Sequence, residues 1–119
     1  MITGPAIARD VIVRYDGQVA AVATPRRVLL APSISCLEGD HPRRRFVAAM
    51  ALVGRQMTRE PGAEPYSDDQ AAFYARMLLI PNDAFEALCD DLADVELAEH
   101  FNVPLEQARA KRDDVELEP

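Results

Sequence analysis

The sequence predicts an α+β fold, in which a small three-stranded antiparallel sheet is followed by four to five helices. Short β-rich runs separated by turn residues fill the chain up to about residue 31, and apolar residues recur with helical spacing from about residue 42 onward. The two patterns do not alternate along the chain. Strands followed by helices are typical of a domain whose helices pack on one face of the sheet.

The three predicted strands cover residues 11–15, 18–23 and 26–31. The first, VIVRY, is rich in β-branched residues and alternates in polarity, as a half-buried strand does. Asp16-Gly17 is a strong hairpin dipeptide, and Thr24-Pro25 separates the second strand from the third. We therefore expect an antiparallel meander of sequential strands.

The first predicted helix runs from about residue 42 to residue 59, with Asp40 as its N-cap. Its apolar residues recur at i, i+3, i+4 and i+7 and should form a buried face: Phe46, Ala49, Met50, Val53 and Met57. A second helix begins after Ser67, the predicted N-cap, with Gln70 at the reciprocal position of a capping box. It should end near Pro81, because proline cannot continue a helix.

Three shorter helices are predicted beyond that proline. Asn82 or Asp83 opens the first of them, and Asn102-Val103-Pro104 separates the other two. The later pair, VELAEHF and PLEQARAKRDD, has the outline of a helix-turn-helix. Because acidic residues surround its few basic ones, we expect this pair to pack on the core rather than bind DNA.

The whole chain of 119 residues is predicted to form a single domain. Within it we place the β-meander in residues 10–31, the helical part in residues 42–112 and a frayed tail in residues 113–119. A chain of this length buries enough surface to fold without a disulfide or a structural metal.

The net charge of −7 argues against nucleic-acid binding and against adsorption to anionic membranes. Acidic residues are concentrated after residue 83, whereas arginines cluster at positions 26, 27 and 43–45. This separation of charge has two interpretations. It is either a solvated surface or a polarised one, whose basic patch would meet an acidic partner.

Metal ligands are few and scattered. The histidines are His41 and His100, and the cysteines are Cys36 and Cys89, with no spacing of the HxxxH or CxxC type. An alternative site would combine Cys36, His41 and a distant carboxylate, but we expect no bound metal and no cofactor. We also find no apolar signal segment and no run long enough to span a membrane, so we expect a cytoplasmic protein with reduced thiols.

Three stretches of the chain carry a resemblance to a known family. They are RRFVAAMALVGRQM at 44–57, SDDQAAFYARMLLIP at 67–81 and LAEHFNVPLEQARAK at 97–111. In their order and spacing the chain resembles the ImmA/IrrE-type zinc metallopeptidases of bacteria and their phages. In that family a β-meander leads into a helix of the type RFTLAHELGHLLLH and then into one of the type EREANAFAAELLMP. The resemblance implies a zincin-like scaffold.

The active-site residues of that family do not carry over. The resemblance puts Met50 at the first ligand histidine, Ala51 at the catalytic glutamate and Gly54 at the second histidine, while Gln70 falls at the third, acidic ligand. HExxH works because two histidines on one helix face reach a single zinc ion while the glutamate activates its bound water. Neither methionine nor glycine supplies those nitrogens, and alanine accepts no proton. We therefore expect no catalytic residue.

The resemblance implies a link to regulation, since active members cleave helix-turn-helix repressors. We expect a non-catalytic protein-binding or regulatory module, whose partner is a protein and could be such a repressor. The expected partner-binding cleft lies near Met50, Gly54 and Gln70. Two alternatives stay open: a metal-dependent peptidase with displaced ligands, and a homo-oligomeric structural module.

Overall fold

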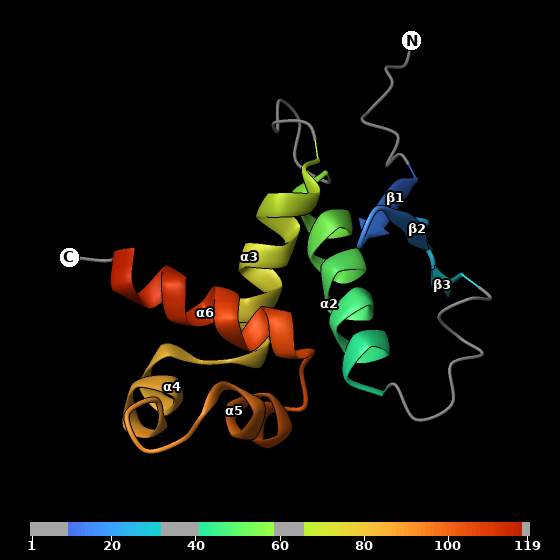
Figure 1. Cartoon of the computed structure of the whole chain (residues 1–119). Coiled ribbons are helices and arrows are strands. Elements are labelled where there is room, and N and C mark those ends of the chain that lie inside the picture. The colour runs from blue at the N-terminus through green and yellow to red at the C-terminus, as the bar shows by residue number, and fades with distance from the viewer. Residues whose placement is uncertain (1–9, 32–40, 59–65, 118–119) are drawn as a thin grey trace, which may run out of the picture.

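The computed structural model describes residues 10–31, 41–58 and 66–117. Its elements are β1 (Val11–Tyr15), β2 (Gln18–Ala23), β3 (Val28–Leu30), α2 (His41–Met57), α3 (Asp68–Leu79), α4 (Asn82–Leu88), α5 (Asp94–Phe101) and α6 (Leu105–Leu117). The α+β prediction is confirmed, because an antiparallel sheet with the order β1-β2-β3 precedes five helices in the described residues. In Figure 1, α2 lies between the sheet and α3, and α4, α5 and α6 gather at one end of that pair.

The predicted β1–β2 hairpin forms at Asp16-Gly17. Both residues have positive φ, 55° and 78°, as a two-residue turn that matches the strand twist requires. Val13 pairs with Ala21 and Arg14 pairs with Val19, so the register shifts by one residue at this point. The extra residue, Ala20, is buried together with Ala21. This bulge therefore adds a small side chain to the buried face of the sheet.

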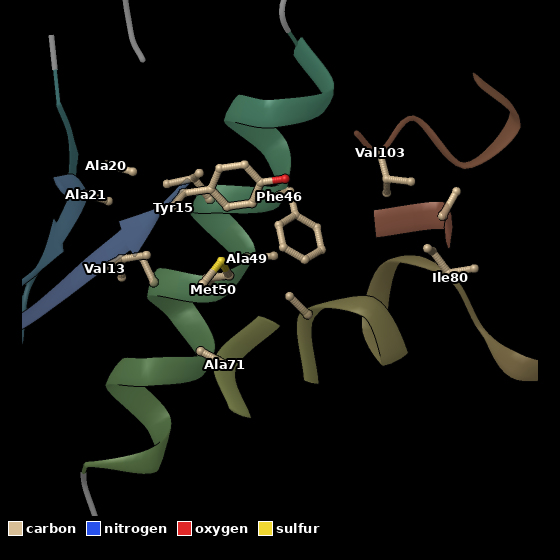
Figure 2. Close-up of a cluster of buried hydrophobic side chains, with 14 of the residues drawn as sticks. Val13, Tyr15, Ala20, Ala21, Phe46, Ala49, Met50, Ala71, Ile80 and Val103 are labelled. Atoms are coloured by element: carbon tan, nitrogen blue, oxygen red, sulfur yellow. The ribbon is translucent and has the colours of Figure 1, made fainter. Parts of the chain in front are cut away.

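The inner face of the sheet packs on α2. Val11, Val13 and Tyr15 alternate toward the helix, which presents Phe46 and Met50 to them, each at most 8% exposed. Figure 2 shows the strand side chains directed at this face of α2, and the rings of Tyr15 and Phe46 meet edge-on with centroids 5.8 Å apart. The helical stripe predicted from the sequence is thus the stripe that covers the sheet.

Helix α3 packs against α2 through small residues. Its buried residues are Ala71 and Ala75, and small side chains allow two helices to approach closely. The predicted cap is confirmed, since Ser67 Oγ accepts a hydrogen bond from the backbone N–H of Gln70 at 3.4 Å. Asp68 and Asp69 in the first turn also favour this end of the helix dipole.

The C-terminal helices have a second apolar centre, in which the five side chains at most 2% exposed are Ile80, Phe85, Leu97, Val103 and Ala108. Asn102 adopts the left-handed conformation, with a φ of 56°, and ends α5. Arg45 of α2 donates to the carbonyl oxygens of Phe101, at 2.6 Å, and Asn102, at 3.1 Å. One arginine therefore ties α2 to the end of α5.

Some element boundaries differ from the prediction. β3 is shorter than 26–31, because Arg26 and Arg27 lie in a turn held by Thr24 Oγ1, which accepts both of their backbone N–H groups at 3.3 and 3.0 Å. The first helix spans 41–57 instead of 42–59. Asp40, its predicted cap, lies outside the described residues.

The tail differs most from its prediction. Residues 113–117, predicted to fray, belong to α6, and Asp114 forms an ion pair with Arg76 of α3. At the other end of the helical part, Pro81 precedes α4 and Asn82 is its first residue, where its side-chain oxygen accepts a hydrogen bond from Lys111. Along the described helices, none combines the length and the hydropathy needed to cross a membrane.

Candidate partner-binding site

A polar pocket of about 210 Å³ is lined by residues of the β1–β2 hairpin, α2, α3 and α6. Met50 of α2, which the resemblance aligns with the first ligand histidine, forms part of its wall, whereas Gly54 and Gln70 do not line it. The other lining residues come from the β1–β2 hairpin, α3 and α6: Arg14, Tyr15, Asp16, Asp68, Asp69, Ala72, Glu106 and Gln107. The sequence did not predict that α6 reaches this point.

The polar atoms around Tyr15 are hydrogen-bonded to one another. The Tyr15 hydroxyl donates to Glu106 Oε2 at 2.5 Å and accepts from Gln107 Nε2 at 3.1 Å. Burial, together with the hydrogen bond to Glu106, raises the pKa of Tyr15 well above its usual value, so the phenol stays protonated at neutral pH. Tyr15 thus joins the sheet to α6 as a neutral hydrogen-bond donor.

Arg76 extends this network toward the C-terminus. Its guanidinium binds Asp114 in a bidentate manner, at 2.7 and 3.2 Å, and also donates to Gln107 Oε1 at 2.9 Å. The side chains of Arg76 and Asp114 are only 12% and 16% exposed. Such a shielded, forked pair holds α6 on α3, so these groups serve the fold.

The structure does not gather the three residues of the expected cleft in one pocket. Met50 is 2% exposed and faces the polar pocket. Gly54 is buried against Tyr66 and Val11, where a Cβ atom would meet the Tyr66 ring at 2.6 Å. Gln70 is exposed on α3, on the opposite side of the helix pair. Of the three, only Gln70 is accessible to a partner.

Burial of Tyr66 has an electrostatic consequence of its own. It raises the pKa of the phenol, and the Asp68 carboxylate adds to this effect. The Tyr66 ring packs directly on Gly54. A small residue at position 54 is therefore explained by the packing of this neighbour.

No cluster of three or more His, Cys, Asp or Glu side chains suited to a metal ion occurs in residues 10–31, 41–58 and 66–117. His41 is exposed at the start of α2, and His100 stacks edge-on against Phe101 at 4.8 Å between ring centroids. Cys36, which the alternative metal site would combine with His41 and a distant carboxylate, lies outside the described residues, while Cys89 is a free thiol. The described donors therefore offer no ligand set for zinc.

An apolar groove opens on the other side of the α2–α3 pair. It has a volume of about 430 Å³ and is lined by Leu52, Val53, Gln56, Met57, Tyr74 and Leu78. Leu52 is 49% exposed, Tyr74 46% and Leu78 66%, and Met77 beside them is 45% exposed. None of the six lining residues carries a charge.

Helical spacing connects this groove to Gln70. Residues 70, 74 and 78 are four apart, so their side chains form one row along α3, and all three are exposed. Gln70 therefore extends the accessible row of the groove. The sequence did not predict that Leu52, Tyr74 and Leu78 would be exposed. In DDQAAFYARMLL the apolar residues cover more of the helix surface than one buried face requires, and this pattern indicates an exposed apolar face on α3.

The α5–α6 pair packs as predicted, with Leu97 and Val103 buried and Phe101 and Leu105 against the core. Its basic residues are largely committed to the fold. Lys111 is 1% exposed, and Arg112 Nη2 lies 3.0 Å from Asp94 Oδ1. A recognition helix needs free basic side chains for phosphates, and on α6 two of them are held by the fold, whereas Arg109 is 63% exposed.

Comparison of the chain with models of known protein families, with curated proteins and with solved structures finds no match. The resemblance to the ImmA/IrrE-type peptidases therefore stays a prediction from the sequence.

Proposed function

We propose that this protein is a non-catalytic protein-binding module and that its α2–α3 groove receives the apolar face of a helix from a partner protein. The groove itself carries this proposal. Four large apolar side chains, Leu52, Tyr74, Met77 and Leu78, are each at least 45% exposed beside one another along two packed helices. Contiguous exposed apolar surface of this kind marks interaction sites in soluble domains.

The shape of the groove favours a helix as its occupant. α2 and α3 run in opposite directions side by side (Figure 1), and residues of both helices line the apolar groove between them. A third helix packs into such a groove through residues spaced i, i+3, i+4 and i+7. Because the lining carries no charge, the contacting face of the partner should be apolar as well.

The polar side of the helix pair supports the non-catalytic part of the proposal. In the predicted alignment with the family, Ala51 takes the position of the general base and Met50 that of the first ligand, and both are at most 2% exposed. The nearby acidic and phenolic groups hold α6 in place through Tyr15, Glu106 and Gln107. The hydrogen bonds of these residues stabilise the fold, and we assign the residues no role as a nucleophile or in activating a water molecule.

The resemblance adds a class of partner to the proposal. If the chain is related to peptidases that cleave helix-turn-helix repressors, it would hold such a regulator without cutting it. Helix-turn-helix proteins expose short amphipathic helices, which match the groove in shape. In this proposal the complex forms in the cytoplasm, consistent with the absence of metal-type or disulfide-type cysteine spacing in the sequence.

The direct test uses a fluorescent amphipathic helical peptide with a leucine face and glutamine flanks, and follows its anisotropy on titration with the intact chain. Leu78→Asp places a charge in the groove and should weaken binding at least about tenfold, because a desolvated carboxylate has no partner there. The matched control is Val95→Asp on α5, where Val95 is 52% exposed and far from the groove in sequence. Equal losses in both variants, or no binding by the wild type, would count against the groove.

A second measurement separates the alternatives. Metal content should be determined by mass spectrometry on tag-free protein after zinc addition and dialysis. One tightly bound zinc ion per chain would favour a peptidase with displaced ligands. Light scattering tests the other alternative, a homo-oligomeric structural module. A dimer that Leu78→Asp dissociates would favour that alternative.

A further inference from the structure

The outer face of the sheet carries an uncovered apolar row. Ile12 pairs with Val22, and Val22 pairs with Leu29, so the three residues lie side by side across all three strands. Ile12 is 46% exposed and Leu29 49%, while Val19, two pairs farther along β1–β2, is 47% exposed. The opposite face of the same strands is covered by α2 and fully buried at Val13.

Exposed arginines flank this row. Arg14 follows Ile12 by two residues in β1, which places it on the outer face, and Arg26 and Arg27 lie in the turn that leads into β3. All three are exposed, and within the described residues none of their guanidinium groups forms an ion pair or a side-chain hydrogen bond. Asp10 precedes β1, and Arg14 also lines the polar pocket together with Asp16, Asp68 and Asp69. The face is therefore both apolar and basic.

Most arginines of the helices are used differently. They bind carboxylates, carbonyl oxygens or an aromatic ring: Arg43, Arg45, Arg55, Arg76 and Arg112. The basic cluster predicted at positions 26, 27 and 43–45 is thus divided by the structure. Arg43 and Arg45 serve the fold, whereas Arg26 and Arg27 stay available beside an exposed apolar row.

We propose that the outer face of the sheet, made of Ile12, Val19, Val22, Leu29 and the flanking Arg14, Arg26 and Arg27, docks an acidic amphipathic helix of another protein. The apolar row would bury the leucine-type face of that helix, and its flanking carboxylates would pair with the three arginines. Charge complementarity selects this occupant, because a cationic or neutral segment would leave the guanidinium groups unpaired at the interface.

The width of the sheet favours a single helix. Adjacent strands lie about 4.8 Å apart, so three strands span about 10 Å, which is close to the diameter of a helix. α2 already covers the inner face of the same three strands in this way. A helix on the outer face would complete a layer on each side of the sheet. This inference is independent of the α2–α3 groove, which lies on the far side of α2 from the sheet.

Nucleic acid fits the face less well. Bases need aromatic side chains to stack on, and the described outer face presents only aliphatic residues between its arginines. The net charge of −7 also opposes the approach of a polyanion, whereas a short peptide with a few carboxylates senses mainly the nearby arginines.

The test compares three labelled peptides of about 18 residues, a length that supports a helix. All share one leucine face, and their flanking positions carry glutamate, glutamine or lysine. In anisotropy titrations with the intact chain, the glutamate peptide should bind at least about tenfold tighter than the lysine peptide, with an advantage that shrinks as salt is added. The double variant Arg26→Glu/Arg27→Glu should lose the preference for the glutamate peptide over the lysine peptide. Leu29→Ser should weaken the binding of the glutamate peptide.

Arg44→Glu is the matched control. Arg44 lies on α2, outside the three strands, so its reversal changes the net charge in the same direction but leaves the docking face intact. The proposal is overturned if Arg44→Glu weakens binding as much as the double variant. It is also overturned if the lysine peptide binds equally well, if duplex DNA binds this face more tightly, or if Leu29→Ser acts only by dissociating a dimer. Loss of peptide binding to Leu78→Asp alone would bear on the groove and leave this face untouched.

Discussion

The two sides of the α2–α3 pair differ in how their side chains are used. On the side that faces the sheet and α6, Met50 is 2% exposed and Tyr15, Glu106 and Gln107 are joined by hydrogen bonds. On the other side, Leu78 is 66% exposed and the lining of the groove carries no charge. One side is closed by its own contacts, and the other is open and apolar.

This difference separates structural from accessible residues. The side where the resemblance would place chemistry holds the fold together, and the side without any motif offers surface to a partner. A substitution on the closed side should therefore change stability, whereas one on the open side should change binding. Four substitutions or conditions test this division, from the largest expected loss of stability to the smallest.

Arg76→Ala should have the largest effect. It leaves Asp114 and Gln107 Oε1 without their donor in a shielded position, which should lower the free energy of unfolding by about 3 kcal/mol. Urea unfolding followed by circular dichroism measures this. The control is Arg109→Ala, because Arg109 is 63% exposed and 3.8 Å from Asp94, so its removal should cost less than about 1 kcal/mol. Equal costs would show that α6 is not held by Arg76.

Gly54→Ala should be the next most damaging change. The new Cβ would meet the Tyr66 ring at 2.6 Å and Val11 Cγ1 at 3.0 Å, and overpacking of this kind costs about 1–3 kcal/mol. A double-mutant cycle with Tyr66→Ala identifies the cause. If the clash with the ring is responsible, Gly54→Ala should cost much less in the Tyr66→Ala background. Strict additivity would assign the cost elsewhere.

High pH should weaken the closed side through Tyr15. Folding raises the pKa of Tyr15 above its unfolded value of 10.0, so the unfolded chain loses this proton first. The contribution is intact below pH 10 and is lost as the pH rises above it, by at most about 1.4 kcal/mol per pH unit. Chemical unfolding between pH 9 and about 11 should therefore show a shallower decline in Tyr15→Phe than in the wild type. Parallel declines in the two proteins would contradict this.

Leu78→Asp should have the smallest effect on stability. Because the side chain is 66% exposed, the free energy of unfolding should change by less than about 0.5 kcal/mol, even though peptide binding at the groove is lost. Thermal unfolding and anisotropy on the same sample measure both quantities. A large loss of stability would mean that Leu78 is buried in solution, for example in a dimer, and the comparison of open and closed sides would then fail.

The order of elements follows from local patterns. Asp16-Gly17 meets the positive φ values of a tight turn, Ser67 caps α3 through its own hydroxyl, and the stripe through Phe46 and Met50 faces the sheet. Each of these depends on residues within a few positions of one another, so sequence spacing alone predicts them. The end of α6 was predicted too early, because its last turn is stabilised by Arg76, 38 residues before Asp114.

The candidate sites could be predicted only in part. The sequence predicts, through the resemblance, that Met50, Ala51 and Gly54 stand at the HExxH positions, and this alignment stays a prediction. The sequence does not show that Tyr66 packs on Gly54, nor that Gln70 turns away from Met50. Both depend on the rotation of α3 about its axis, which is set by the packing of Ala71 and Ala75.

By itself, the sequence determined the α+β class, the β1–β2 hairpin and the Ser67 cap of α3, since each is a property of residue type and local spacing. Only the tertiary structure decided which apolar residues stay exposed. A hydrophobic stripe in the sequence indicates that one face of a helix favours burial. It does not show whether another element of the fold covers that face. At Leu52, Leu78, Ile12 and Leu29 the described part of the chain supplies none, and the distant contacts of Tyr15 with Glu106, 91 residues away, close the other side instead.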